Sequence, residues 1–276
     1  MRRYSSSPIT SFARLVYACF FACLLTATPL HAQEFDLGSL EAMTPNTEIS
    51  PIPRGLVLGG VFIGSNARFS GQDDMAVPIP GAVYFGENFL YLGDRARYYF
   101  YREGAFAAFA YGRVRFSNLD PDDSPELSGM KKREWEPEAG IGANVILPHA
   151  LLTFRATSDI SGTSKGQEML FWSDFPMVHD RLLVMPGIGM LWRSSKLANY
   201  YFGGVSAEEA RPGRPQHDTG ATWSPMASVV TTYRFDRSWI ATLSGSLEHF
   251  DSGTADSPIV GHDNEYFVIA GVGYVW

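Results

Sequence analysis

The sequence predicts an all-β protein, a transmembrane antiparallel β-barrel of about twelve strands with short periplasmic turns and longer extracellular loops. Three observations predict it: runs in which apolar and polar residues alternate, connections that alternate between short and long, and an N-terminal stretch typical of a secretion signal. Such alternation is expected of strands that present one face to lipid and the other to a polar interior. We therefore expect the protein in the bacterial outer membrane.

The first 32 residues have the features of a signal peptide. A basic start is followed by an apolar run, Leu15 to Leu25, and Leu30-His31-Ala32 offers a small residue at the cleavage site. This run is too short to span a bilayer, which needs ~20 apolar residues. We expect cleavage after Ala32. The alternative is a lipoprotein anchored through Cys23, although Phe20 stands where a leucine is usual.

Composition excludes several classes of protein. The chain has 276 residues, enough for one large β domain, and its 14% aromatic residues and 27 glycines suit aromatic girdles and tight turns. Cys19 and Cys23 both lie in the signal, so the mature chain has no disulfide, thiolate metal site or cysteine nucleophile. Removing the three signal arginines takes the net charge from -7 to -10. We expect no nucleic-acid partner for so acidic a chain.

Residues 33–53 are expected to form a periplasmic N-terminal tail, and residues 54–276 the barrel. The tail is polar, carries Pro45, Pro51 and Pro53, and shows no clear periodicity. It is either a passive leader or an arm that binds a periplasmic partner.

The first half of the barrel contains five candidate strands. They are the runs 55–64, 77–85, 88–92, 96–102 and 105–117, with a polar loop at 65–74. The two short runs between 88 and 102 meet at Gly93-Asp94-Arg95 with hardly any outer loop. For this reason ten strands is the fallback count. Either even number places both chain ends in the periplasm.

The later strands alternate most clearly. In the run Phe106 to Phe116, one face is apolar and the other holds Tyr111, Arg113 and Arg115. The same pattern recurs in the runs 135–145, 152–159, 182–192, 223–234, 239–248 and 264–276. Residues 168–176 alternate poorly and are assigned to a strand only because of their neighbours.

The connections separate a membrane barrel from a soluble one. A soluble barrel shows the same alternation with its apolar face turned inward, so alternation alone does not decide. Short turns are expected near residues 86–87, 103–104, 148–149, 179–180 and 236–237, and long polar loops at 65–74, 118–131, 161–166, 194–219 and 251–263. Short turns on one rim and long loops on the other are typical of outer-membrane barrels.

Several short motifs occur in an order that is similar to one known family. The stretch Asn199 to Ala210, NYYFGGVSAEEA, resembles the NYYYGV…EA signature of the MipA/OmpV outer-membrane proteins. Further matches are Gly129-Met130 followed by Arg133, Trp223-Ser224-Pro225, Ser257-Pro258-Ile259-Val260 and the closing Tyr274-x-Trp276. The resemblance covers roughly residues 78–276. Gly203-Gly204 carries one glycine more than the signature, and Trp276 stands where the family usually ends in phenylalanine.

The resemblance implies an integral outer-membrane barrel without enzymatic activity. Members of the family are described as scaffolds that bring a murein-degrading lytic transglycosylase and a murein-synthesising penicillin-binding protein together, and others as envelope-stress proteins or adhesins. It also implies that the barrel assembly machinery reads the aromatic end, Tyr274 and Trp276. Outer-membrane lipid and lipopolysaccharide are the expected surroundings, and acidic loops suit divalent ions that bridge lipopolysaccharide.

No constellation of catalytic residues stands out in the sequence. Three His-Asp pairs, His179-Asp180, His217-Asp218 and His262-Asp263, fall on different connections, so we expect solvated loop residues rather than a metal site. Ser246 and His249 lie on one strand with opposite parity and therefore face opposite sides of the wall. We expect no enzyme, cofactor or metal. The alternative to a scaffold is a small diffusion pore with a charged lumen.

Charged residues on the polar faces predict an ion-paired lumen. They are Arg113, Arg115, Glu134, Glu136, Glu138, Arg155, Arg234 and Glu248. If residues 118–131 form a hairpin loop, numbers adding to about 249 face each other, which sets Arg113 opposite Glu136 and Arg115 opposite Glu134. We expect this cluster to leave little open channel. The alternative is that the same residues line a narrow water-filled pore.

Overall fold

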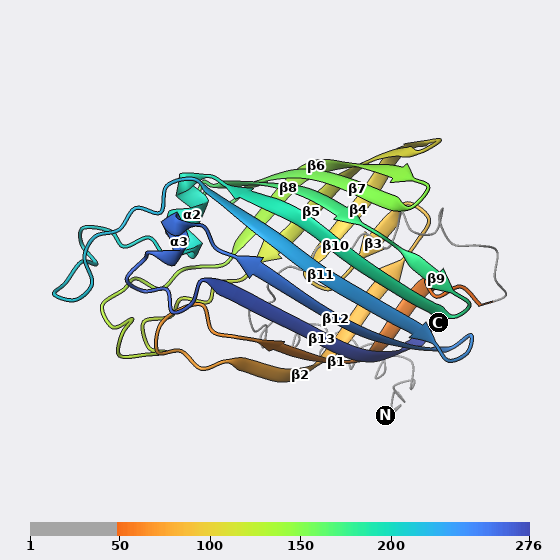
Figure 1. Ribbon diagram of the computed structural model, residues 1–276, viewed down its shortest axis with the longest axis horizontal. Coiled ribbons are helices and arrows are strands. Elements are labelled where there is room, and N and C mark those ends of the chain that lie inside the picture. Colours follow the sequence, from red (N-terminus) through yellow and green to blue (C-terminus); the bar gives the residue numbers. More distant parts are fainter. Residues whose placement is uncertain (1–48) are drawn as a thin grey trace, which may run out of the picture.

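The protein is a closed antiparallel β-barrel. The computed structural model describes residues 49–276, so the predicted signal peptide and residues 33–48 of the predicted tail lie outside the described part. Its strands are β1 Gly55–Ser65, β2 Met75–Phe85, β3 Phe89–Tyr91, β4 Arg95–Glu103, β5 Phe106–Arg115, β6 Glu136–Leu147, β7 Ala150–Asp159, β8 Gln167–Asp174, β9 Met177–His179, β10 Leu182–Arg193, β11 Thr222–Arg234, β12 Trp239–His249 and β13 Asn264–Val275. Two short helices, α2 Ser195–Tyr201 and α3 Ser252–Ala255, lie at one end of the barrel (Figure 1).

Apart from β8 and β9, consecutive strands pair with each other, and β13 pairs with β1 to close the wall. The closing register runs from Val57 opposite Val275 to Ser65 opposite Phe267. β8 and β9 both pair with β10, so they act as one interrupted strand. Counted in this way, the described residues form a wall of twelve strands, which confirms the predicted number and excludes the fallback of ten.

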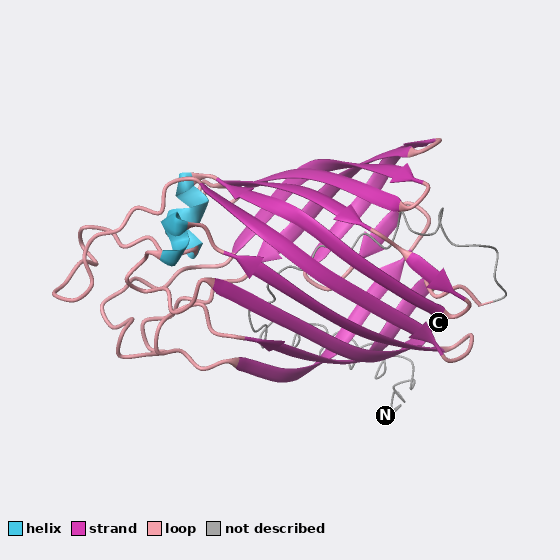
Figure 2. Cartoon of the chain, in the orientation of Figure 1, coloured by secondary structure: helices cyan, strands magenta, loops and turns pink. Residues whose placement is uncertain are grey.

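The two rims differ as predicted. Short turns connect the strands at one end, and long loops gather with both helices at the other (Figure 2). The exception is β3, which has three residues and returns to β4 through the tight turn 92–94. We call the two ends the short-turn rim and the long-loop rim.

The wall carries its apolar side chains outward. Ile141, Leu243 and Val272 are largely exposed, whereas Phe109 and Tyr111 on β5 point into the lumen and are buried. Contact with water would be unfavourable for such a continuous apolar band, whereas contact with lipid would not. None of the helices in the described range is long and apolar enough to cross a membrane.

Residues that the sequence assigned to the end of the tail enter the barrel. Pro51, Ile52 and Pro53 are buried, and Ile52 packs with an apolar cluster at the short-turn end of the lumen. The partners of Ile52 are Leu151, Leu183, Met185 and Val230. Thr232 donates a hydrogen bond to the Pro51 carbonyl at 3.3 Å. The last residues before the barrel therefore fill part of its short-turn mouth.

The predicted register of the β5–β6 hairpin is wrong by two residues. Arg113 lies opposite Glu138 and Arg115 opposite Glu136. A shift of two keeps every side chain on its predicted face, because only an odd shift exchanges the faces. The physical cause is the loop, since Glu134 is held outside the ladder: its N–H donates to the Tyr200 hydroxyl at 3.0 Å, and its carbonyl accepts from Tyr201 at 2.6 Å.

Candidate functional site

The candidate site is a set of buried, oppositely charged side chains in the long-loop half of the lumen, which we call the lumen ion cluster. It consists of Arg113 and Arg115 on β5, Glu136 and Glu138 on β6, Arg155 on β7, Glu168 on β8, Arg193 on β10 and Glu248 on β12. Alternation places all of them inward, because each stands on the face opposite to the lipid-facing residues of its strand. The cluster has four guanidinium groups and four carboxylates.

Glu168 is the centre of the cluster. Its carboxylate accepts hydrogen bonds from Arg113 Nη2 at 2.8 Å, Arg115 Nη2 at 2.8 Å and Arg155 Nη2 at 2.7 Å. Arg193 Nε lies 3.5 Å from Glu168 Oε2. A single carboxylate thus draws four strands together through charge-assisted hydrogen bonds.

Glu138 links the same two β5 arginines a second time. It accepts from Arg113 Nε at 2.7 Å, from Arg115 Nε at 2.5 Å and from the Thr157 hydroxyl at 3.2 Å. Glu136 is fully buried beside it, 3.9 Å from Arg115 Nε, and accepts from the Ser164 backbone N–H at 3.0 Å.

A second pair of carboxylates extends the network across β12 and β13. Glu248 and Glu265 lie directly opposite each other in the sheet, where like charges destabilise the pairing. Each has its own guanidinium. Arg193 pairs with Glu248 through both terminal nitrogens, one of them at 2.9 Å, and Arg68 Nη2 pairs with Glu265 at 2.7 Å.

Aromatic side chains close the cluster from the long-loop rim. Phe202, at the end of α2, is 1% exposed, and its ring centroid lies 3.8 Å from the Arg193 guanidinium and 4.3 Å from that of Arg68. These distances fit cation–π contacts, which strengthen when water is excluded. Leu197, Ala198 and Tyr201 form the buried face of α2. We call α2 together with residues 202–210 the lid.

Both glycines after α2 are needed for the lid's shape. Gly203 has a φ of +124°, which a side chain rarely tolerates. A Cβ on Gly204 would lie 2.3 Å from the Asn199 carbonyl oxygen. The additional glycine noted in the sequence therefore has a structural role.

The lid is tied to the loop between β5 and β6. Arg133 Nη1 lies 2.9 Å from Glu209 Oε1, and the Glu209 carboxylate also accepts from the backbone N–H groups of Lys131 at 2.9 Å and Ser206 at 3.0 Å. Partial burial alone would raise the pKa of Glu209, but the hydrogen bonds from Arg133 and the two N–H groups lower it to about 2. The carboxylate is consequently ionised at any ordinary pH.

Most of the charged residues predicted from the sequence meet in the lumen. Arg113, Arg115, Glu136, Glu138, Arg155 and Glu248 lie in the cluster. Two do not. Glu134 is exposed and lies two residues before β6 begins. Arg234 lies at the short-turn rim, where its Nε donates to the Asp236 carbonyl at 3.2 Å.

Sequence reasoning missed Glu168, Arg193, Arg68 and Glu265. Glu168 is the second residue of β8, whose inward face continues with the apolar Leu170 and Trp172, so the expectation of a polar interior fails there. The outward residues Met169 and Phe171 were the signal that would have shown which face of the strand Glu168 is on.

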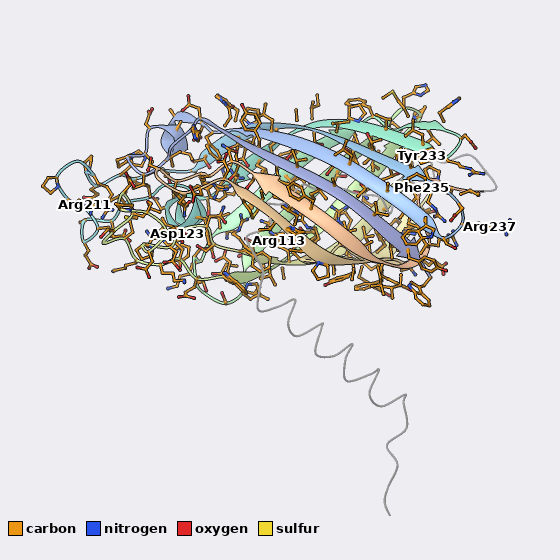
Figure 3. The ribbon with its side chains drawn as sticks, turned by 90° about the horizontal axis from the view of Figure 1, so that it is seen from below. Arg113, Asp123, Arg211, Tyr233, Phe235 and Arg237 are labelled. Atoms are coloured by element: carbon orange, nitrogen blue, oxygen red, sulfur yellow. The ribbon has the colours of Figure 1, made fainter. Side chains whose placement is uncertain are left out.

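Figure 3 shows Arg113 within the barrel, Asp123 and Arg211 among the long loops, and Tyr233, Phe235 and Arg237 at the opposite end.

The predicted His-Asp pairs do not converge. Among residues 49–276, no group of three or more His, Cys, Asp or Glu side chains has the arrangement of a metal site. His217 Nε2 contacts the Gly253 carbonyl at 2.7 Å, and His249 Nδ1 contacts the Asn264 side chain at 2.9 Å. Both contacts are structural.

The chain end is aromatic and exposed. Tyr274 packs edge to face against Trp239, with ring centroids 5.4 Å apart, and against Trp276 at the same distance. Trp276 is 75% exposed at the short-turn rim. Its role in assembly stays a prediction.

The sequence matches the family model described as MltA-interacting protein MipA over residues 58–276. It is 22% identical over 211 residues to the MltA-interacting protein of Escherichia coli (strain K12), covering 75% of this chain and 84% of that protein. It is 28% identical over 156 residues to outer membrane protein OmpV of Vibrio cholerae, covering 56% of this chain and 60% of that protein. An outer membrane channel from Pseudomonas putida F1 has a similar structure, with a TM-score of 0.41 and 10% identity over 83% of this chain and 99% of that one.

Proposed function

Because the chain belongs to the MipA family and is an outer-membrane β-barrel, we propose that it is a non-enzymatic scaffold with a closed lumen, which acts by presenting binding surfaces rather than by conducting solutes. The lumen ion cluster and its lid are the observation that carries this proposal.

The lumen is proposed to be closed because its guanidinium and carboxylate groups are paired at hydrogen-bond distance. An ion crossing this part of the barrel would have to separate guanidinium and carboxylate groups that are 2.5 to 2.9 Å apart and nearly fully buried. Desolvating such charges costs several kcal/mol per ion unless each keeps its partner. A barrel of twelve strands is only moderately wider than one of eight, whose interior side chains fill it.

The binding partner that we propose is an enzyme of murein turnover, on the basis of the similar proteins. The Escherichia coli relative is named for an interaction with MltA, and the family resemblance indicates a murein-degrading lytic transglycosylase and a penicillin-binding protein. Murein lies in the periplasm, so such enzymes would meet the short-turn rim. That rim offers Glu87, Asp180 and Arg237 on turns, together with the aromatic chain end.

Binding of a purified lytic transglycosylase to the reconstituted barrel tests this proposal. We expect saturable binding to proteoliposomes in which the short-turn rim faces outward. Reversing charges on that rim, in Asp180→Lys with Arg237→Glu, should weaken binding, whereas Lys196→Glu on the lid should not. Binding no stronger than to an unrelated outer-membrane barrel would reject the scaffold role, and large steady conductance would favour the pore.

A further inference from the structure

A second compartment of the lumen is apolar. A cavity of about 260 Å³ lies on the side formed by β1, β2, β12 and β13, away from most of the lumen ion cluster. Its lining includes Val57, Val61, Ile63, Ile79, Ile240 and Ile269. Asp94 and Arg95 are the charged lining residues, and they are paired with each other at 2.7 Å. An apolar cavity of about 150 Å³ stays free of water and binds benzene, so the present cavity is large enough for an apolar ligand.

The barrel wall is interrupted beside this cavity. β2 pairs with β1 along all of Met75–Phe85, but on its other side it pairs with β3 only at Tyr84 and Phe85. Within the described part of the chain, no strand pairs with Met75–Val83 on that side. Ile79 to Val83 and the turn residues Leu92 to Arg95 line the cavity from the two sides of the break. The cavity therefore lies against the unpaired edge of β2.

Two prolines suit β2 to an open edge. Pro78 and Pro80 are two residues apart, so their nitrogens point to the same side of the strand. A proline cannot donate to a ladder, and in sheets it is found on edge strands. Because β1 is paired along the whole of β2, the two missing N–H groups belong to the unpaired side. Fewer donors are then left without a partner there.

The break lies at the height of lipid-facing residues. Leu58 and Phe62, opposite Ala82 and Pro78 in the sheet, are exposed on the outer surface of β1. An open edge with unsatisfied backbone groups is unfavourable in hydrocarbon, and Pro78 and Pro80 reduce the number of unsatisfied N–H groups at this one. The unpaired edge therefore lies between the bilayer core and the apolar cavity.

We propose that this cavity binds a single hydrocarbon chain of a membrane lipid, which enters sideways between β2 and the β3–β4 turn. The chemistry of the lining matches an acyl chain and offers no free charge for a polar ligand. The chain's own residues 33–48 are a poor occupant, since they include Glu34, Asp36, Glu41 and Glu48 and no basic residue. This inference does not depend on the proposed partner.

Thiol labelling in lipid vesicles tests the proposal. Thr242→Cys places a thiol in the cavity, and peptide mass spectrometry identifies the labelled residue. A maleimide attached to a dodecyl chain and dissolved in phosphatidylcholine vesicles should label Thr242→Cys much faster than Thr153→Cys, which is buried inward on β7 outside the cavity. A sulfonated, membrane-impermeant maleimide should label Thr242→Cys poorly.

Filling the cavity provides the matched control. Adding Val61→Trp should reduce labelling of Thr242→Cys by the dodecyl reagent about tenfold, equivalent to about 1.4 kcal/mol of chain binding. Phe62→Trp, the next residue on the lipid-facing surface, should leave it unchanged, and heat-modified gel migration verifies that both variants fold. Faster labelling by the sulfonated reagent, or equal labelling in both tryptophan variants, would overturn the proposal. Protection by toluene but not by palmitic acid would reassign the cavity to small aromatic solutes and would also overturn it.

Discussion

Glu168 is the residue on which the lumen ion cluster depends most, because four guanidinium groups surround its carboxylate. Replacing it by glutamine keeps the shape and removes the charge, which leaves the arginines short of one buried partner. Breaking a buried ion pair in this way costs about 3–5 kcal/mol. We expect Glu168→Gln to lower the urea midpoint of unfolding in detergent, as followed by tryptophan fluorescence.

The matched control is Glu87→Gln, on an exposed turn. It should leave the midpoint unchanged, because surface charges contribute little. If the two variants unfolded at the same midpoint, the cluster would not stabilise the barrel.

Glu209 gives the lid a defined dependence on pH. Hydrogen bonds from Arg133 and two backbone N–H groups lower its pKa to about 2, from an ordinary value of 4.5. Because the pKa of Glu209 is lower in the folded state, its contribution to the stability of the folded lid is fully present above pH 4.5 and is lost as the pH falls toward 2. We expect cleavage of residues 194–221 by pepsin to increase steeply over this range.

Glu209→Gln should remove that dependence by making the lid susceptible at pH 4.5 already. Exposed Glu208→Gln is the control and should behave like the unmodified chain. A lid equally resistant at pH 2 and pH 5 would contradict the assigned role of Glu209.

At the scale of elements, β13 is the strand that closes the barrel. It pairs with β1 and β12, and Trp276 extends it with a hydrogen bond from its N–H to the Leu56 carbonyl at 2.8 Å. Because the Trp276 indole is largely exposed and so accessible to the assembly machinery, we expect Trp276→Ala to reduce the folded fraction in the outer membrane, measured by heat-modified gel migration.

Trp239→Ala is the control for losing an exposed aromatic at the same rim, since Trp239 also contacts Tyr274. It should fold in nearly normal yield. Equal yields for Trp276→Ala and the unmodified chain would show that the assembly machinery does not read the last residue.

The strands were largely predictable, and their mutual arrangement less so. Alternation is a local property, so runs such as 106–116 and 239–248 showed their lipid-facing sides directly. The register across residues 116–135 was not predictable, because a long loop does not fix the pairing of the strands it joins. The lid was expected to be part of a polar loop, but α2 buries Leu197 and Tyr201 through contacts with residues distant in the sequence. Glu168 was missed for the same reason, since its partners lie on three other strands.

At the scale of the whole molecule, the barrel divides its lumen between two kinds of chemistry. Charged groups under the lid lie on β5 to β8, on β10 and, at Glu248, on β12, and an apolar cavity beside the unpaired edge of β2 is lined by β1, β2, β12 and β13. The first arrangement opposes the passage of ions along the barrel axis. The second admits hydrocarbon from the membrane.

Single-channel recording in planar lipid bilayers tests the closed lumen most directly. We predict that the unmodified protein is nearly silent and that Glu138→Gln combined with Glu168→Gln produces openings that favour anions, because unbalanced guanidinium groups then line the path. Glu134→Gln, which lies outside the cluster, should remain silent. Large, steady conductance in the unmodified protein would contradict the closed lumen and identify the barrel as a pore.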